Sequence, residues 1–151
     1  MAGLGTGAAP FRAFIQHRAW QRSQGLTVGP LVYYFGARYS SQEYLYGEEI
    51  EAYLRGGVLT HAGLAFSRDT NKKVYIQHKM LEDGPMLSDI LTAEKEEDKA
   101  YFYLCGPTWP VPDVYEALVG SLEGNKGVER KRAEEMIEEW KEEERYVLEV
   151  Y

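Results

Sequence analysis

The stretch GLGTGAAPF, residues 3–11, decides the fold that we expect for this chain. Its glycines at positions 3, 5 and 7 allow a backbone loop to approach a pyrophosphate closely. Ala8 to Gln24 is predicted to be a helix, with Pro10 in its first turn and apolar residues recurring along one face. A flexible glycine-rich end would contain the same glycines. The helix behind them favours a phosphate site, because a helix N-terminus offers free N–H groups and a partial positive charge.

The segment before this loop is unusually short. A glycine-rich phosphate loop ordinarily follows a strand, which aims the loop at the ligand. Only Met1 and Ala2 precede Gly3 here. We therefore expect a truncated first strand, and we interpret the chain as a piece of a longer protein, cut within or just after that strand.

Beyond the loop, short apolar runs alternate with helical patterns. The expected strands are Leu31–Phe35, Val58–Phe66, Tyr101–Leu104 and Tyr146–Tyr151, with a short extended piece at Val74–Gln77. The further expected helices are Ser41–Leu54, Pro85–Ala93, Asp113–Leu122 and Val128–Arg145. This alternation predicts an α/β fold: a doubly wound, Rossmann-like parallel sheet of about five strands with helices on both faces. Ligands of such sheets bind outside the carboxyl ends of the strands.

Length and charge limit the classes of protein to which the chain can belong. Its 151 residues are the size of one domain. A net charge of −7 argues against a nucleic-acid footprint, which would be basic. No apolar run reaches the roughly 18–20 residues of a membrane helix, and the N-terminus lacks a secretory signal pattern. The single cysteine, Cys105, excludes an internal disulfide and fits a reducing compartment, so a cytoplasmic location is expected.

A second anion site is predicted at the end of the third strand. Ser67 and Arg68 end that strand, and Lys73 follows within ten residues. Two cations and a hydroxyl suit a phosphate monoester such as the 2′-phosphate of NADP(H), whereas an acidic residue there would favour NAD(H). Tyr75 is placed to stack on adenine. A turn with solvated charges fits the same spacing equally well.

Cys105 is the remaining candidate for chemistry. A lone cysteine is most often a buried structural thiol, but this one stands at a strand end before Gly106. Nucleophilic Cys–His chemistry has little support, since the three histidines are scattered and none has metal-ligand spacing. The glutamates of residues 134–144 alternate with an apolar stripe, as on a solvated helix face. No metal site is predicted.

Six blocks of sequence, in order, resemble the C-terminal NADP-binding domain of the ferredoxin–NADP reductase-like diflavin reductases. This group includes cytochrome P450 reductase, the nitric oxide synthase reductase region and the sulfite reductase flavoprotein. The blocks are GLGTGAAPFRAFIQHRA (3–19), YYFGAR with EYLYGEE (33–49), AFSRD (65–69), KVYIQH (73–78), YLCG (103–106) and RYVLEVY (145–151). The stretch CGPTWPVPDVYEAL (105–118) is most similar to the fungal assimilatory sulfite reductase flavoprotein subunit.

The resemblance implies roles for the matching residues. At the cofactor phosphates the resemblance places Gly5, Thr6 and Gly7, with Arg38 near the pyrophosphate. At the 2′-phosphate it places Ser67, Arg68 and Lys73, and beside the adenosine Tyr75 and Gln77. Asp113 matches a further cofactor-binding residue once one residue is skipped after Cys105. The implied catalytic residues are Cys105 and Glu149, where nicotinamide meets flavin, and Tyr151, which would cover the flavin ring and move aside for nicotinamide. Many relatives carry Asp in place of Glu149 and Trp in place of Tyr151, so gating and nucleotide selectivity are expected to differ.

The implied reaction is hydride transfer from NADPH to FAD, followed by electron transfer through FMN to an acceptor, with sulfite reductase haemoprotein preferred. The implied partners are the FAD-binding and flavodoxin-like domains of the same enzyme. The FAD-binding domain is absent from residues 1–151, so this NADP-binding domain alone is expected to bind NADP(H) weakly and to be inactive. The alternatives are the same module of a P450-reductase-type or methionine-synthase-reductase-type enzyme, and a non-catalytic truncated nucleotide-binding module.

Overall fold

A computed structural model describes all 151 residues and contains one sheet of five parallel strands. The order across the sheet is β3-β2-β1-β4-β5. The strands are β1 (Ala2–Leu4), β2 (Val32–Ala37), β3 (His61–Phe66), β4 (Phe102–Gly106) and β5 (Tyr146–Val150). The predicted α/β class, the parallel sheet of about five strands and the short first strand are confirmed.

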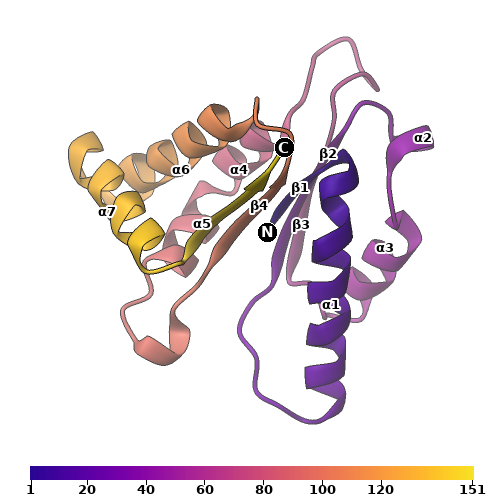
Figure 1. Ribbon diagram of the computed structural model, residues 1–151, viewed down its shortest axis with the longest axis horizontal. Coiled ribbons are helices and arrows are strands. Elements are labelled where there is room, and N and C mark those ends of the chain that lie inside the picture. Colours follow the sequence, from indigo (N-terminus) through magenta and orange to yellow (C-terminus); the bar gives the residue numbers. More distant parts are fainter.

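Helices cover both faces of this sheet (Figure 1). On one face lie α1 (Ala8–Ser23) and α3 (Gly47–Arg55). The other face carries α4 (Ile76–Glu82), α5 (Gly84–Leu91), α6 (Val111–Lys126) and α7 (Arg130–Glu142). The remaining elements are the single turn α2 (Ser40–Glu43) and the 3₁₀ turns η1 (Gly5–Gly7) and η2 (Glu96–Asp98). No helix is both long enough and apolar enough to span a membrane.

Strand residues alternate between two apolar cores. Tyr33 and Phe35 of β2 pack with Phe11 and Ile15 of α1, whereas Tyr34 belongs to the larger core under α4–α7. Successive side chains of a strand point to opposite faces, so a sheet covered on both sides buries nearly every residue of its central strands. This explains why β1 and most of β2 are continuous buried runs.

The structure corrects two predicted elements. The helix expected over Ser41–Leu54 is broken into α2 and α3, and Tyr46 between them has a left-handed backbone (φ 59°). The extended piece expected at Val74–Gln77 is wrong at its second half, because Ile76 and Gln77 open α4. Ile76 and Met80 are both fully buried, and this i, i+4 spacing is that of a helix packed on the sheet.

The order of the strands creates a crevice beside β1. The chain runs from β1 outward to β2 and β3, then returns to β4 on the other side of β1. The loops after β1 and β4 therefore lead to helices on opposite faces, which is the switch point where open α/β sheets bind ligands. At this point Gly7 packs directly on β4: a Cβ added there would lie 2.1 Å from the Cys105 carbonyl oxygen.

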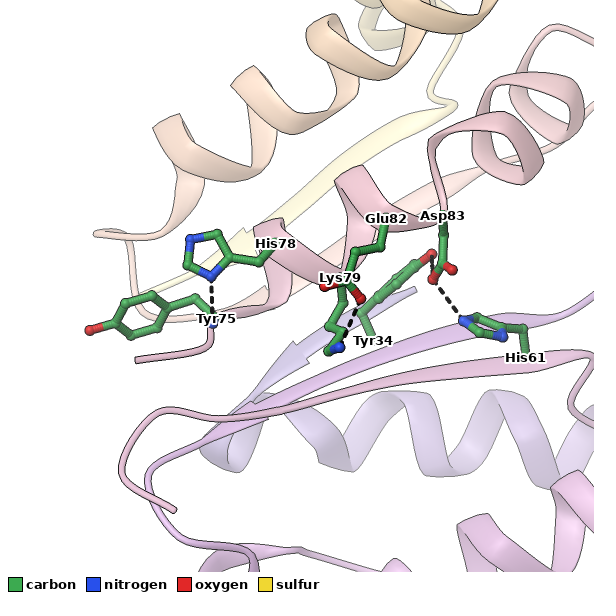
Figure 2. Close-up of polar contacts among 7 residues, drawn as sticks. All are labelled: Tyr34, His61, Tyr75, His78, Lys79, Glu82 and Asp83. Carbon is green, nitrogen blue, oxygen red and sulfur yellow. Dashed lines mark hydrogen bonds and ion pairs between the residues drawn. The ribbon is translucent and has the colours of Figure 1, made fainter. Parts of the chain in front are cut away.

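A polar cluster attaches α4 to the sheet (Figure 2). The Tyr34 hydroxyl donates to Asp83 Oδ2 (2.9 Å), and His61 Nε2 lies 2.7 Å from the same oxygen. Burial, and then the contact with Asp83, raises the pKa of Tyr34, so its hydroxyl remains a donor. At the other end of α4, His78 Nδ1 accepts a hydrogen bond from the Tyr75 N–H (3.2 Å). Both ends of this helix are therefore fixed.

Arg145, which precedes β5, is buried with 8% of its surface exposed. Its guanidinium donates to the carbonyl oxygens of Ala100 and Leu91, both at 3.0 Å, and to Glu143 (3.1 Å). The same group lies over the Trp140 ring, 5.5 Å from its centroid. Arg145 therefore links the segment before β4, the end of α5 and the end of α7.

Replacing Arg145 by Met should destabilise the protein by about 2–4 kcal/mol, because two buried carbonyl groups lose a charged donor. Urea unfolding followed by circular dichroism would measure this loss. Arg132→Met is the matched control: Arg132 is a half-exposed residue paired with Glu139, and its loss should stay below about 1 kcal/mol. Equal losses in the two variants would contradict the structural role of Arg145.

Candidate functional site

A cavity of about 430 Å³ lies at the carboxyl ends of the strands. It is lined by the loop after β1, the ends of β2 and β3, the start of α4 and the loop after β4. Six residues predicted from the sequence line it: Gly5, Thr6, Arg38, Ser67, Tyr75 and Tyr151. The structure thus brings together groups that are far apart in the sequence, such as Thr6 and Tyr151, which are separated by 145 positions.

The glycine loop, residues Gly3–Gly7, forms the wall beside α1. Gly5 has a left-handed backbone (φ 56°) with open space where a side chain would be, so the loop is exposed to the cavity. Gly7 is pressed against Cys105 and begins the turn into α1. The 16-residue helix α1 directs its amino end, with its partial positive charge, at this point. The arrangement suits an anion such as a phosphate.

The Thr6 hydroxyl already has a partner within the chain. It lies 2.5 Å from the Tyr151 hydroxyl. The backbone of Tyr151 is fixed separately, since its N–H donates to Gly106 O (3.1 Å) and its carbonyl accepts from Thr108 N (3.1 Å). The ring itself is 66% exposed. A phosphate oxygen that approached Thr6 would therefore compete with the Tyr151 hydroxyl.

Basic side chains gather where β2 and β3 end. Ser67 N donates to Ala37 O (3.0 Å) and Arg68 N to Arg38 O (2.9 Å), so strand pairing continues one step beyond β3. Arg68 and Lys73 are exposed, and neither side chain forms an ion pair. Lys72, in the same loop, is likewise exposed and unpaired. Three uncompensated cations in one loop make this a second place for an anion.

Arg38 is held by a residue that the sequence did not predict for the site. Its Nε and Nη2 donate to Glu43 Oε1 (3.0 and 2.6 Å), and its backbone N–H donates to Glu43 Oε2 (2.8 Å). These hydrogen bonds hold the pKa of Glu43 below its ordinary value. The charge of Arg38 is therefore already balanced, and Glu43 fixes the direction of the guanidinium.

Gln77 and Asp113 lie outside the cavity lining but contact one another. Gln77 Nε2 donates to Asp113 Oδ2 (3.2 Å), which links the first turn of α4 to the first turn of α6. Gln77 is two residues beyond Tyr75, which does line the cavity. The pair therefore borders the Tyr75 side of the cavity.

Cys105 and Glu149 are paired neighbours on β4 and β5. Cys105 packs with the core on the α1 face of the sheet, and neither residue lines the cavity. Burial, and then the negative charge of Glu149, raises the pKa of the Cys105 thiol. The thiol is therefore protonated at neutral pH, which argues against a nucleophilic role. Of the three predicted catalytic residues, only Tyr151 lines the cavity.

Other residues of the cavity were missed by the sequence reasoning. Gly36 forms part of an apolar floor, where an added Cβ would lie 2.7 Å from Leu4 Cδ2 and 3.0 Å from Ile76. Trp109 contributes a ring that is 61% exposed. A tryptophan near two prolines in a strand-end loop was the available signal for it. No group of three His, Cys, Asp or Glu side chains is arranged to hold a metal ion.

Comparison with known proteins gives consistent results. The model of the oxidoreductase NAD-binding domain matches residues 1–111. The probable sulfite reductase (NADPH) flavoprotein component of Schizosaccharomyces pombe is 48% identical to this chain over 151 residues. The sulfite reductase (NADPH) flavoprotein component of Saccharomyces cerevisiae is 47% identical over 154 residues. Each of these matches covers 100% of this chain and 14% of the relative. The NADPH–cytochrome P450 reductase of Drosophila melanogaster is 38% identical over 152 residues, covering 100% of this chain and 22% of that protein.

These relatives are far longer than the chain, which spans only 14% of the fungal proteins. The family match covers residues 1–111 and therefore includes the glycine loop, the cationic loop after β3 and four of the five strands. Since this match extends over well more than half of its length, the chain belongs to the oxidoreductase NAD-binding domain family.

Proposed function

We propose that residues 1–151 are the NADP-binding domain of a flavoprotein reductase, which binds NADPH and presents its nicotinamide to FAD. The observation that carries this proposal is the position of the glycine loop, which lines the cavity at the β1–β4 switch point, relative to the loop after β3. That second loop lines the cavity at both of its ends, through Ser67 and Tyr75, and carries the unpaired cations Arg68 and Lys73 between them, outside the cavity lining. The names of the fungal and insect relatives, which all specify NADPH, support the choice of cofactor.

The glycine loop and α1 would hold the cofactor's pyrophosphate. Gly5, Thr6 and Gly7 supply backbone N–H groups and a hydroxyl, and the open space above Gly5 fits a phosphate group. Arg38, whose charge is balanced by Glu43, adds a fixed set of N–H donors at the end of β2. The helix N-terminus favours negative charge here without a paired lysine or arginine.

Ser67, Arg68 and Lys73 would bind the 2′-phosphate that distinguishes NADPH from NADH. A phosphate monoester carries more negative charge than a free hydroxyl, and Arg68 and Lys73 have no carboxylate to neutralise them. Asp69 is the one acidic residue of this loop, and its two carboxylate oxygens accept the Ser40 N–H (3.1 and 3.3 Å) instead of pairing with Arg68 or Lys73. The adenosine would lie against Tyr75, with Gln77 and Asp113 beside it.

The nicotinamide end would lie toward Cys105, Glu149 and Tyr151. NADPH, when bound, supplies the hydride, and the chain supplies orientation and electrostatics. The raised pKa keeps Cys105 as a neutral thiol, able to contact a ring without adding charge. Glu149, exposed beside it, offers a carboxylate to the same region. Tyr151 would move aside when nicotinamide enters, and such lid movements often limit turnover.

For the complete protein we propose FAD-binding and flavodoxin-like FMN domains and, as electron acceptor, the sulfite reductase haemoprotein. The names of the two fungal relatives support this acceptor. A P450-reductase-type enzyme is the second candidate, supported by the 38% identity to the insect protein. The single cysteine supports a cytoplasmic location. This chain alone would bind the cofactor without catalysing its oxidation.

Calorimetric titration of the chain with 2′,5′-ADP and, separately, with 5′-AMP tests the proposal. Clear preference for the bisphosphate is expected, because only that ligand reaches the loop that contains Arg68 and Lys73. Equal affinity for the two ligands would contradict the assignment of a 2′-phosphate site to this loop. Binding of neither, by a chain whose circular dichroism shows it to be folded, would overturn the proposed function of the isolated domain.

Arg68→Ala should lower the affinity of the chain for 2′,5′-ADP about 10- to 150-fold, because it removes a charge-assisted hydrogen bond worth roughly 1.5–3 kcal/mol. Affinity for 5′-AMP should stay the same. Lys72→Ala is the matched control, since it removes one exposed positive charge from the same loop at a position without a proposed contact. A similar loss in both variants would indicate general electrostatic attraction in place of a specific site.

Tyr151→Phe should bind NADP⁺ about two- to tenfold more tightly, because Thr6 is then free of its hydroxyl partner, a hydrogen bond worth about 0.5–1.5 kcal/mol. Calorimetry measures the change directly. Tyr101→Phe, at the opposite end of β4, removes an exposed tyrosine hydroxyl and should have no effect. Weaker binding by Tyr151→Phe would show that the hydroxyl assists the cofactor.

Glu149→Gln should lower the pKa of Cys105, because it removes a nearby negative charge that disfavours the thiolate. Alkylation by iodoacetamide at pH 8 should then be faster than in the unmodified chain, and the midpoint of the rate against pH should fall. Glu142→Gln, on the exposed side of α7, should leave both unchanged. Identical pH profiles for the two variants would place Glu149 too far from the thiol to act on it.

A further inference from the structure

Trp109 is a large exposed aromatic residue inside the proposed cofactor cavity. Its ring is 61% exposed, although it lies in a lining that includes Thr6, Arg38 and Ser67. The ring centroids of Trp109 and Tyr75 are 6.4 Å apart, and the two planes meet at 78°. The two side chains therefore form a corner with an uncovered indole surface.

The loop that carries Trp109 is well fixed. Pro107 and Pro110 have restricted φ angles on either side of it, and Pro110 disfavours a helical backbone at Trp109. Thr108 N donates to Tyr151 O, and Val111 N donates to Thr108 O, both at 3.1 Å. A rigid aromatic side chain loses little conformational freedom when a ligand covers it, so more of its contact energy is available for binding.

The two anion sites limit where a base can lie. In a 2′-phosphorylated nucleotide, one ribose bears the 2′-phosphate, the 5′-phosphates and the base. With the 2′-phosphate at Ser67 and the pyrophosphate at Thr6, the base must lie in the cavity between or beside them. Tyr151 is engaged at the glycine loop through its hydroxyl. The aromatic surface left for the base is the corner of Tyr75 and Trp109.

We propose that Trp109 is a further nucleotide-binding residue, whose indole forms with Tyr75 a two-sided aromatic pocket for the purine base of the cofactor. The inference rests on the proposed NADP-binding function and assigns a role to the loop after β4. A planar purine stacks on one ring and meets the other at its edge, because the rings are close to perpendicular. The pocket selects for the base and is separate from the cations that select for the 2′-phosphate.

Calorimetric titration of the whole chain with 2′,5′-ADP tests this role in Trp109→Leu, Trp109→Phe and the control Trp20→Leu. Trp20 is a comparable exposed tryptophan, 54% exposed on α1 and outside the cavity. Base stacking on an aromatic side chain predicts about a 5- to 150-fold loss of affinity for Trp109→Leu. Trp109→Phe should keep most of the affinity, and Trp20→Leu all of it.

Fluorescence gives a readout that a purely structural role would not change. In a Trp20→Phe background the remaining tryptophans are Trp109, exposed, and Trp140, buried. Saturating 2′,5′-ADP should quench and shift the emission of Trp109, and inorganic pyrophosphate, which has no base, should not.

The possible outcomes separate the two proposals. The role of Trp109 would be overturned if Trp109→Leu bound 2′,5′-ADP with an affinity within twofold of that of the unmodified chain and the nucleotide caused no change in fluorescence. The proposed function would then remain intact. Failure of the unmodified, folded chain to bind 2′,5′-ADP would overturn both. A loss for Trp109→Leu that Trp109→Phe largely restores, together with quenching by the nucleotide alone, supports the aromatic pocket.

Discussion

The contact of Gly7 with the Cys105 carbonyl is the constraint on which the site depends. A side chain at position 7 would lie 2.1 Å from that oxygen, so only glycine allows the loop after β1 to lie against β4. This contact sets the start of α1, directs the amino end of that helix at the cavity, and places the loop after β4 on its other side. The glycine loop and the end of β4, after which the Trp109 loop begins, are thereby held together by a single backbone contact.

Local patterns predicted most of the fold because the sheet is covered on both faces. The continuous apolar runs Leu31–Phe35 and Tyr101–Leu104 indicated buried strands, and β2 and β4 lie within two residues of these expected places. The third strand begins at His61, three residues later than expected. Boundaries failed where tertiary packing decides the conformation. The left-handed backbone of Tyr46 breaks the helix expected over Ser41–Leu54, and the burial of Ile76 and Met80 makes a helix of a segment that begins like a strand.

The candidate site was predictable in its residue types but not in its pairings. Cations after a strand and glycines before a helix have a local physical meaning, so Arg68 and the glycine loop could be identified from the sequence alone. The partners of these groups could not. Thr6 meets Tyr151 across 145 positions, and Gln77 meets Asp113 across 36, contacts that depend on how the strands are ordered. Trp109 gave only a weak local signal, a tryptophan near two prolines, because its place in the cavity beside Tyr75 depends on the fold.

The anchoring of α4 at both ends has a consequence for how such a domain changes its nucleotide specificity during evolution. Asp83 holds one end of the helix to the sheet, and the contact between Tyr75 and His78 fixes the other. The cationic loop is therefore a nine-residue insert between two rigid supports, β3 and α4. Its six exposed residues, 68–73, can change with little effect on either core, whereas Val74 packs against the larger core and Tyr75 caps α4. Under the proposed function, a change of nucleotide specificity over long periods would require substitutions only within those six positions.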